Sequence, residues 1–335
     1  MPDYAKYVEA ARFAVASACV VCKQVQRSLE QVRAITKDDA SPVTIADYAS
    51  QAVIAHALRE RLGTVALVAE EASAFLRRDD NQFYRDATLA AVREMWPDAD
   101  ENQMLDAIDV GAADPVDHAS GFWTLDPIDG TKGFLRGDQY CVALAYVEHG
   151  RPTIGVLGCP NLPSSFSDPL DVPDSHGTIY FTVAGEGLYQ IHADHASEKP
   201  THIRRLDHVP GEPVVMCESV ESAHSDQSAS SRVLARVGKT APPVRIDSQC
   251  KYAVVARGQA DAYLRLPTKR GYVERIWDHA AGAIIAAEAG CAVSDMDGKP
   301  LDFSRGRGLE DNRGIVCAST TLHGRVLGAI RELGL

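Results

Sequence analysis

The chain has 335 residues, a length that favours two domains of roughly 100–200 residues each. It carries 34 Lys+Arg against 46 Asp+Glu, a net charge of −12, and its 45% hydrophobic and 24% charged residues are ordinary for a globular protein. This composition excludes a disordered chain, a fibre and a collagen, and the acidic balance argues against a protein that coats nucleic acid or a membrane surface. An anionic small substrate stays possible, because a metal ion and a few basic side chains can reverse the field inside one pocket.

The sequence pattern predicts neither a membrane span nor a disulfide framework, and no signal peptide is apparent. Its most apolar stretch, residues 14–21, is far shorter than the about 20 residues that a spanning helix needs. The N-terminus shows no basic segment before an apolar run, so we expect a cytoplasmic protein. The eight cysteines are scattered, and most lie within apolar runs, which indicates reduced, buried thiols. Cys19 and Cys22 have the spacing of half a zinc site, but no second pair follows, and we interpret them as core-facing thiols one helical turn apart.

The first half of the chain places helices before strands. The predicted elements are, in chain order, an amphipathic helix over 4–34, a loop over 37–42, a helix from about 45 to 62, a buried strand over 65–69, an acidic solvated segment over 97–118, a strand over 122–125, and two hairpins, 140–147 with 153–157 and 178–183 with 188–191. Polar residues 193–202 are predicted to link two domains.

The second half alternates strands with helices, a pattern typical of an α/β layer. The predicted elements are a strand over 214–217, a helix over 248–257, a strand over 262–266, a helix over 278–289, a strand over 315–318 and a C-terminal helix. We therefore expect an α+β domain over residues 1–192 and an α/β domain over residues 193–335.

Carboxylates stand at the ends of several predicted elements. Glu70 and Glu71 follow the buried strand, Asp126 and Asp129 lie three residues apart around a proline-restricted turn, and Asp278 precedes a helix. Oxygen ligands of this kind suit Mg²⁺, and one carboxylate that bridges two ions would give the two-metal arrangement used for phosphoryl displacement. Gly130 and Thr131 then open a possible helix N-terminus, whose free N–H groups suit a phosphate.

Each of these residues also has an ordinary structural interpretation. A single aspartate at a turn is usually a cap or an Asx-turn, and Asp278 could be only the N-cap of its helix. Glu71 is better interpreted as a neighbour of a ligand than as a ligand. The Asp-x-Asp-x-Thr motif of haloacid-dehalogenase-type phosphatases is a rival, but the spacing here is Asp-x-x-Asp-Gly-Thr and does not fit it. The joint pattern of carboxylates therefore favours a metal site.

Two segments carry a resemblance to a known family. Asp-Pro-Ile-Asp-Gly-Thr at 126–131 and Trp-Asp-His-Ala-Ala-Gly at 277–282 resemble the inositol-monophosphatase superfamily of Mg²⁺-dependent, lithium-sensitive phosphatases. The longer strings at 131–140 and 155–163 are similar to its branch of 3′(2′),5′-bisphosphate nucleotidases from fungi and plants, with further matches at 41–44, 218–222, 263–267 and 300–303. The resemblance covers nearly the whole chain from about residue 40. It implies a layered αβαβα sandwich with the site between two domains.

The resemblance also implies roles for individual residues. The implied metal ligands, for two or three Mg²⁺ ions, are Glu70, Asp126, the Ile128 carbonyl, Asp129 and Asp278. Asp47 and Thr131 would together orient and deprotonate the attacking water. The substrate would contact Gly130, Thr131, His224, Ser248, Lys251 and Arg265.

The expected function follows from the same resemblance. We expect hydrolysis of the 3′-phosphate of adenosine 3′,5′-bisphosphate to AMP, and possible action on 3′-phosphoadenylyl sulfate, an activity that belongs to sulfur metabolism. An inositol mono- or bisphosphate phosphatase is the first alternative, and a metal-dependent ligand-binding protein without strong catalysis is the second. The expected partner is a small phosphorylated nucleotide, with no nucleic acid and no membrane, and the expected state is a monomer.

Overall fold

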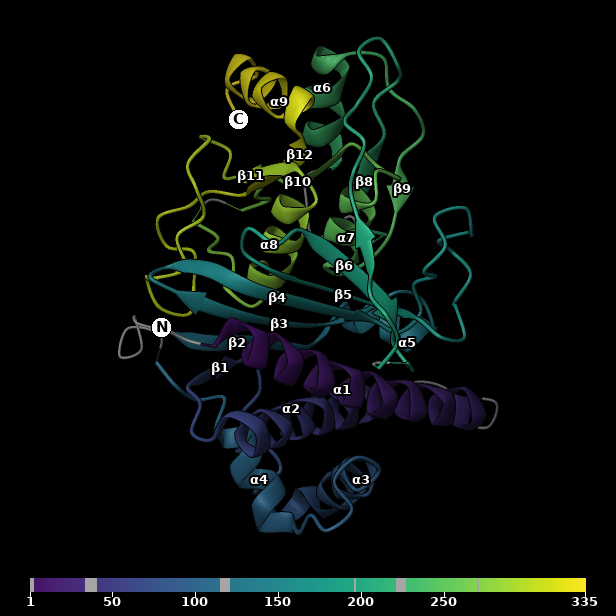
Figure 1. Cartoon of the computed structure of the whole chain (residues 1–335), viewed down its shortest axis with the longest axis vertical. Helices are drawn as coiled ribbons and strands as arrows, with labels where there is room; N and C mark the ends of the chain where they lie inside the picture. Colours follow the sequence, from purple (N-terminus) through teal and green to yellow (C-terminus); the bar gives the residue numbers. More distant parts are fainter. Residues whose placement is uncertain (1–2, 34–40, 115–120, 196, 221–226, 270) are drawn as a thin grey trace.

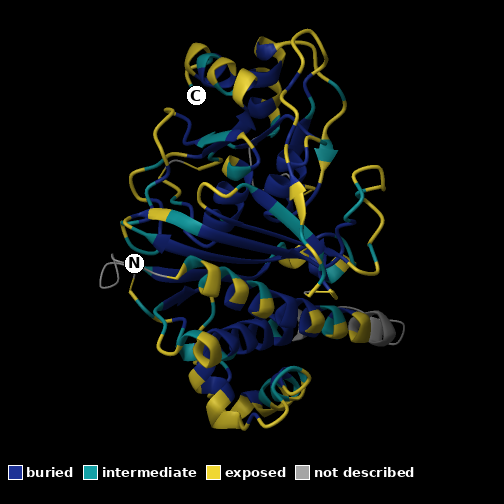
Figure 2. Cartoon of the chain, in the orientation of Figure 1, coloured by how far each residue is buried: buried dark blue, intermediate teal, exposed yellow. Residues whose placement is uncertain are grey.

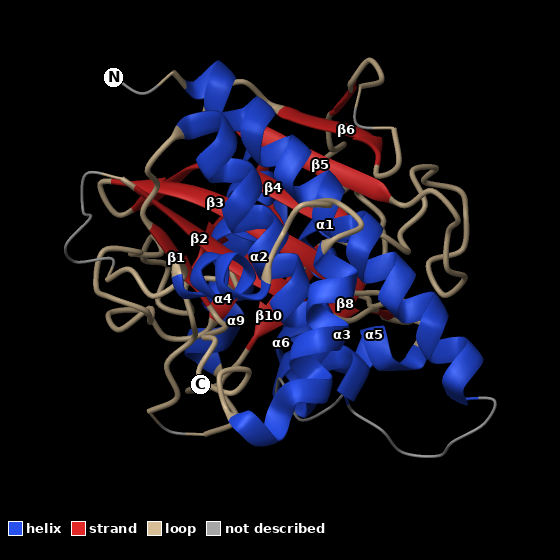
Figure 3. Cartoon of the chain, turned by 90° about the horizontal axis from the view of Figure 1, so that it is seen from below, coloured by secondary structure: helices blue, strands red, loops and turns tan. Residues whose placement is uncertain are grey.

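Helices and sheets alternate in five layers in the computed structural model, which describes residues 3–33, 41–114, 121–195, 197–220, 227–269 and 271–335 (Figure 1). The outermost layer consists of α1 (Tyr4–Arg33) and α2 (Ser41–Leu62), which pack against each other and cover one face of the larger sheet (Figure 3). Two short helices, α3 (Gln82–Val92) and α4 (Glu101–Asp109), pack on α2 away from the sheet, next to the 3₁₀ turn η1 (Asp79–Asn81).

The second layer is a seven-stranded sheet in the order β1-β2-β3-β4-β5-β6-β7. Only β1 and β2 run parallel, and all later neighbours are antiparallel. The strands are β1 (Leu67–Ala69), β2 (Phe122–Asp129), β3 (Cys141–Glu148), β4 (Arg151–Cys159), β5 (Thr178–Val183), β6 (Leu188–His192) and β7 (Thr201–Ile203). The short helix α5 (Thr131–Arg136) follows β2 at the edge of the sheet.

The remaining three layers come from the second half of the chain. The helices α7 (Cys250–Ala256) and α8 (Ala280–Glu288) lie between the two sheets, and α6 (Gln227–Val237) and α9 (Thr320–Glu332) cover the outer face of the smaller sheet (Figure 1). The five strands of that sheet, in spatial order, are β11 (Cys291–Ser294), β12 (Ile315–Ser319), β10 (Ala262–Arg265), β8 (Met216–Glu218) and β9 (Val244–Arg245). The expected αβαβα sandwich is confirmed.

Separate apolar cores fill the spaces between these layers. One core joins α1 and α2 to the larger sheet, a second joins that sheet to α7, α8 and the smaller sheet, and a third lies under α6 and α9. Figure 2 shows the consequence, since β2, β3 and β5 of the larger sheet are almost wholly buried while the outer helices are exposed on one side only. The near-continuous apolar strands β3 and β5 therefore follow from burial on both faces of their sheet.

Two predicted features of the fold are confirmed in detail. The hairpin between β3 and β4 turns at His149 and Gly150, whose φ values of 51° and 74° are those of the tight turn that matches strand twist. Cys19 and Cys22 of α1 are both buried in the apolar core between the outer helices and the larger sheet. All eight cysteines are free and buried.

Several element boundaries differ from the predictions by a few residues, and three of the differences bear on the fold. The helix α2 begins at Ser41 rather than near Ile45, because proline at position 42 fits the first turn of a helix; residues 37–40 of the predicted loop lie outside the described part of the chain. The end of the linker predicted over 193–202 is wrong, because Thr201–Ile203 forms β7 and completes the larger sheet. The strand predicted to end at Leu125 continues to Asp129, as described below. No helix in the described residues is long and apolar enough to cross a membrane.

Candidate active site

The parallel pair β1 and β2 brings the first carboxylates together. Both strands end at the same edge of the larger sheet, and the Glu70 backbone N–H donates to the Leu125 carbonyl at 3.3 Å. Glu70, which follows β1, is thereby placed beside the end of β2, where Asp126 and Asp129 lie. The sequence prediction of a buried strand that delivers carboxylates at its C-terminal end is confirmed.

A β-bulge orients Asp126 and Asp129 on one face of the sheet. Asp126 is opposite Ala143 and Asp129 is opposite Cys141, so three steps along β2 match two steps along β3. In a regular strand, residues three apart point to opposite faces, and the extra residue of the bulge removes this alternation. The predicted proline turn was therefore wrong, although its consequence, two carboxylates directed to one point, is what the bulge produces.

The second half of the chain supplies Asp278 from the segment before α8. The N-cap of α8 is His279, so the interpretation of Asp278 as a helix cap was wrong. Gln249 joins the two halves of the site: its backbone N–H donates to Asp129 Oδ2 at 2.6 Å, its Nε2 donates to the Trp277 carbonyl at 2.9 Å, and its Oε1 accepts from the Gly282 N–H at 3.0 Å. The residue before Asp278 is thus fixed relative to Asp129.

These residues line one cavity of about 380 Å³, which is large enough for a small phosphorylated ligand. Its walls combine carboxylates, basic side chains and hydroxyl groups. The lining residues are Glu70, Asp126, Ile128, Asp129, Gly130, Thr131, Lys132, Ser219, Asp247, Ser248, Lys251, Arg265, Tyr272 and Asp278.

The carboxylates of this cavity repel one another in a poorly solvated place. Burial and repulsion from Asp278 raise the pKa of Glu70 to about 7, and burial and repulsion from Asp129 raise the pKa of Asp278 to about 6. Burial, and then the charges of Glu70 and Asp129, raise the pKa of Asp126 well above its usual range. Burial also raises the pKa of Asp129, partly offset by the nearby Lys251. Such a cluster is stabilised by added positive charge.

The hydrogen bonding of Asp126 tests whether the carboxylates of the cavity are suited to bind a metal ion. Its Oδ1 atom is buried and has no hydrogen-bond partner within the described part of the chain. Buried polar atoms are almost always paired, and an oxygen without a partner is expected where a bound ion would supply one. The donor set is entirely oxygen, which matches hard divalent cations. The residues present therefore fit the metal that the sequence predicted.

Besides Lys132, two cationic side chains of the second half of the chain line the same cavity. Lys251 is buried on α7, with its ammonium 5.3 Å from the centre of the Tyr263 ring. Arg265 extends from β10, where its Nε donates to Glu274 Oε1 at 2.9 Å and its Nη2 lies 4.0 Å from Asp278 Oδ2. Basic groups beside an acidic metal site are suited to hold a second anionic group of a ligand.

The loop at Ser248 lies close against the start of α5. Gly130 has a φ of 91°, and a Cβ there would lie 2.9 Å from the Ser248 Cβ, so a side chain would push the two segments apart. Ser248 itself adopts a left-handed φ of 66°, and its Oγ accepts from the Cys250 N–H at 3.1 Å. The predicted helix start at Thr131 is confirmed.

The remaining predicted residues are placed as follows. Asp47 is buried on α2 and is not among the residues that line the cavity, and burial and the charges of Glu71 and Glu70 raise its pKa well above the usual range. Thr131 is exposed and lines the cavity. Both residues are described, and no hydrogen bond joins their side chains in this structure. His224 lies outside the described residues.

Sequence reasoning missed four residues that organise the site. Besides Gln249, the buried Glu274 holds Arg265 and also contacts His279 Nε2 at 3.2 Å. Asp247 pairs with Arg136 of α5, and Arg307 donates to the carbonyls of Ala69 and Gly111 while its guanidinium lies 4.8 Å from the Trp277 ring centre. These contacts join segments far apart in the chain, so only Glu274 and Asp247, as acids near predicted site residues, left any signal in the sequence.

Comparison with known proteins agrees with this arrangement. Residues 5–335 match the Inositol monophosphatase family. A "Probable 3′(2′),5′-bisphosphate nucleotidase 4" of Arabidopsis thaliana is 41% identical over 340 residues, covering 98% of this chain and 95% of that protein. The 3′(2′),5′-bisphosphate nucleotidase of Schizosaccharomyces pombe is 39% identical over 317 residues, covering 92% and 89%.

The fold comparison points to the same group. A solved inositol monophosphatase from Zymomonas mobilis superimposes with a TM-score of 0.63 at 17% sequence identity, covering 99% of this chain and 100% of the other. The chain therefore belongs to the inositol monophosphatase family, a generally metal-dependent group of phosphatases. The resemblance stated from the sequence is confirmed.

Proposed function

We propose that this chain is a Mg²⁺-dependent hydrolase that removes the 3′-phosphate of adenosine 3′,5′-bisphosphate to give AMP and phosphate. The observation that carries the proposal is one cavity lined by five carboxylates from both halves of the chain, four of them the proposed metal ligands, together with Lys251 and Arg265. The curated relatives at 39% and 41% identity, which bear the name 3′(2′),5′-bisphosphate nucleotidase, support the same substrate class. Action on 3′-phosphoadenylyl sulfate, which shares the 3′-phosphate, is part of the proposal.

The acidic side of the cavity would hold two or three Mg²⁺ ions. Glu70 and the Ile128 carbonyl are proposed for the first ion, Asp129 and Asp278 for the second, and Asp126 for both. When bound, magnesium neutralises the phosphate dianion and lowers the pKa of water. The raised pKa values of Glu70 and Asp126, together with the unpaired Asp126 Oδ1, support this assignment.

Asp47 and Thr131 are proposed to act on the attacking water. A threonine hydroxyl is too weak a base to take a proton alone, so it would donate its own proton to Asp47 and accept one from the water. The high pKa of Asp47 suits a proton acceptor. Water would attack in line and displace the 3′-oxygen, with no phosphoenzyme.

The basic side of the cavity is proposed to bind the part of the substrate that does not react. Lys251 and Arg265 would hold the 5′-phosphate through charge-assisted hydrogen bonds, while Ser248, Gly130 and His224 would contact the remainder. The buried position of Lys251 and the fixed Arg265–Glu274 pair support a specific rather than a diffuse contact.

We also infer that the reaction takes place between two domains, residues 1–192 and 193–335, and that the protein acts as a monomer. Separate sheets in the two halves support the division, although β7 of the second segment pairs with the first sheet.

A phosphate-release panel tests the proposal. The substrates are adenosine 3′,5′-bisphosphate, 3′-phosphoadenylyl sulfate, inositol 1-phosphate, inositol 1,4-bisphosphate and fructose 1,6-bisphosphate, each with Mg²⁺ and with a chelator. AMP is the matched control, since it carries only the 5′-phosphate. We expect the highest kcat/KM for adenosine 3′,5′-bisphosphate, no release from AMP and none in chelator. Rapid release from AMP would overturn the assignment of the reacting phosphate.

An inositol phosphatase is the second candidate. It is favoured by the family match and by the superposition on the Zymomonas mobilis inositol monophosphatase. A higher kcat/KM for an inositol phosphate than for the nucleotide in the same panel would select it.

A further inference from the structure

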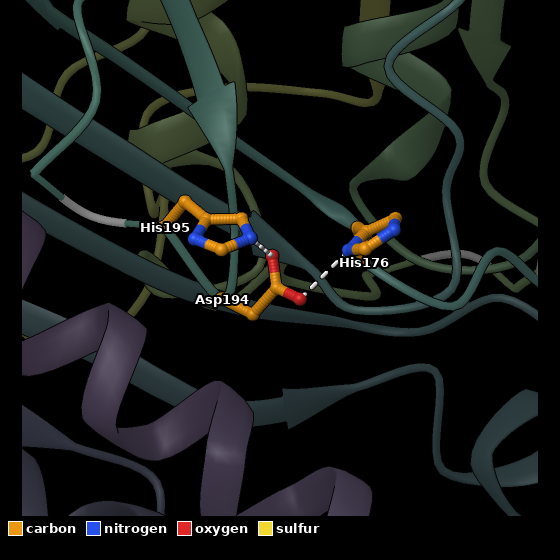
Figure 4. Close-up of side chains that lie close together, drawn as sticks. All are labelled: His176, Asp194 and His195. Carbon is orange, nitrogen blue, oxygen red and sulfur yellow. Dashed lines mark hydrogen bonds and ion pairs between the residues drawn. The ribbon is translucent and has the colours of Figure 1, made fainter.

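Three ligand-bearing side chains gather at one end of the larger sheet, outside the candidate active site. His176 precedes β5, while Asp194 and His195 follow β6. Figure 4 shows the two imidazoles on either side of the Asp194 carboxylate, with His176 Nδ1 2.8 Å from Oδ2 and His195 Nε2 3.7 Å from Oδ1. One donor atom from each residue lies within 4.8 Å of the other two.

Strand register explains why these residues meet. Thr178 is opposite His192 in the antiparallel pair β5–β6, and the Ala193 N–H continues the ladder by donating to the Gly177 carbonyl at 3.1 Å. One further step along each strand places His176 opposite Asp194. The meeting of His176 with Asp194 thus continues the strand register, and His195 follows in the turn, where its backbone N–H donates to the His192 carbonyl at 3.2 Å.

The segment before His176 is anchored independently. Asp174 Oδ1 accepts from the backbone N–H groups of His176 at 2.8 Å and Gly177 at 2.6 Å. The Lys23 ammonium of α1 donates to the carbonyls of Pro160 and Asp174 at 2.9 and 3.0 Å. A donor held in this way loses little conformational entropy when it binds a ligand.

The neighbouring His192 does not belong to the donor set. Its Nδ1 contacts Glu198 Oε2 at 3.0 Å and its Nε2 contacts Ser164 Oγ at 3.0 Å, so both ring nitrogens are engaged. By contrast, His176 Nδ1 is hydrogen-bonded only to Asp194, another member of the donor set, and the side chains of His176, Asp194 and His195 are 53%, 42% and 61% exposed, so an ion from solvent can reach them.

The donor chemistry differs from that of the active site. Two imidazoles with one carboxylate suit zinc and its neighbours among the transition metals, whereas Mg²⁺ prefers oxygen alone. Bonds of about 2.1 Å in a tetrahedron separate ligand atoms by roughly 3.4 Å. His176 Nδ1 lies 2.8 Å from Asp194 Oδ2 and His195 Nε2 lies 3.7 Å from Oδ1, so a small rotation of these exposed side chains would bring one carboxylate oxygen and both ring nitrogens to a common ion. Three protein ligands leave one position for water.

We propose that His176, Asp194 and His195 bind a single divalent transition-metal cation of the zinc class, separate from the ions of the active site. The ion would join the start of β5 to the segment after β6 and stabilise that end of the sheet. The three carboxylates of Asp174, Asp194 and Glu198 outnumber the two nearby cations, Lys23 and Arg27, so the local charge favours a cation.

Zinc binding by the full chain tests the site, measured by competition with a chromogenic chelator in excess Mg²⁺. The variants are His176→Ala, His195→Ala and their double, with His202→Ala as the matched control because His202 is an exposed histidine of the same sheet. All four keep the active-site carboxylates, so a difference between them reports the new site. Circular dichroism and Mg²⁺-dependent phosphate release verify folding.

We expect the wild-type chain and His202→Ala to bind one Zn²⁺ more than the double variant, and each single variant to bind it at least about tenfold more weakly. Co²⁺ should give a visible spectrum that the double variant lacks. The melting temperature should rise with Zn²⁺ in the wild type and His202→Ala but less in the double variant. Equal zinc stoichiometry and affinity in the wild type and the double variant would overturn the proposal.

Discussion

Individual carboxylates in this protein occupy positions that they would avoid without a cation. Asp126 is 3% exposed, carries an oxygen with no hydrogen-bond partner in the described residues, and faces Glu70 and Asp129. An unpaired buried charge is costly, and proteins retain such groups where they bind a metal or take part in chemistry. The same residue should therefore weaken the metal-free fold and support the reaction.

Asp126→Asn separates these two effects. The amide resembles the protonated acid in shape but cannot balance two cations, so turnover should be nearly abolished. Removing one charge from the cluster should leave the metal-free chain at least as stable as the wild type. Phosphate release and thermal melting with and without Mg²⁺ measure both. Near-normal activity of the folded variant would contradict the assignment of Asp126 as a metal ligand.

Thr131→Ala and Asp47→Asn test the proposed proton acceptor. Each should lower kcat with little change in KM, and the double variant should lose no more than the worse single variant, because groups that act as a unit are not additive. Steady-state kinetics of all three variants supply the numbers. Losses that multiply in the double variant would show that the two residues act separately.

Arg265→Ala tests the nucleotide side of the cavity. Loss of a charge-assisted contact costs about 1.5–3 kcal/mol, or roughly ten- to a hundredfold in kcat/KM. The loss should fall on adenosine 3′,5′-bisphosphate and be much smaller for a simple phosphate monoester.

Removing Arg265 also leaves the buried Glu274 without its arginine. The double variant Arg265→Ala/Glu274→Gln removes that stray charge and should show the same substrate selectivity. Arg313→Ala, which breaks an exposed ion pair with Asp297, is the control. It should leave kcat/KM unchanged for both substrates. Equal losses on both substrates would mean that Arg265 serves the reacting phosphate or the fold.

At the scale of elements, the carboxylates of the cavity lie at the ends of β1 and β2 and in the segment before α8, and these segments meet at one edge of the larger sheet. The bulge in β2 directs two carboxylates to one face, and Gln249 connects that strand to the segment before α8. The Arg307 contact with the Ala69 carbonyl connects the end of β1 to the second half of the chain in the same way. Relative positions of the carboxylates are thus set by a few buried contacts between elements.

Gln249→Leu should show this dependence. The substitution leaves the Trp277 carbonyl and the Gly282 N–H without partners in a buried place, at about 1–3 kcal/mol for each group. Chemical denaturation should report lower stability, and the Mg²⁺ concentration for half-maximal activity should rise because Asp278 follows Trp277. Gln259→Leu, which removes one exposed hydrogen bond to Phe166, is the matched control and should change stability by less than about 0.5 kcal/mol. Equal behaviour of the two variants would exclude the connecting role of Gln249.

At the scale of the whole molecule, both halves of the chain contribute carboxylates to one cavity, where these groups repel one another. Glu70 has an ordinary pKa of 4.5 that folding raises to about 7, and Asp278 one of 3.8 that folding raises to about 6. The folded metal-free chain therefore binds more protons than the unfolded chain between these values. Stability then falls as pH rises from about 4 to 7, and the loss is complete above the folded pKa values.

Mg²⁺ should offset this loss, so its stabilising effect should be larger at pH 8 than at pH 5.5. Thermal melting with Mg²⁺ and with a chelator at both pH values measures the difference, and Asp126→Asn should reduce it. A Mg²⁺ effect that does not grow with pH would contradict an acidic metal site as the source.

The amino-acid sequence by itself determined most elements and the type of chemistry. Apolar runs such as residues 140–147 predict buried strands, and the carboxylates at 70, 126, 129 and 278 predict a site for a hard cation through their own chemistry. Local patterns also located the β3–β4 hairpin, since its turn depends only on neighbouring residues.

Only the tertiary structure decided how these residues meet. The bulge that directs Asp126 and Asp129 to one face comes from pairing with β3, and β7 forms because β6 offers a free edge, neither of which is local information. The roles of Gln249 and the meeting of His176 with Asp194 likewise depend on contacts between distant segments. A single sequence records which groups are present, whereas burial, register and the spacing of charges arise when the layers pack.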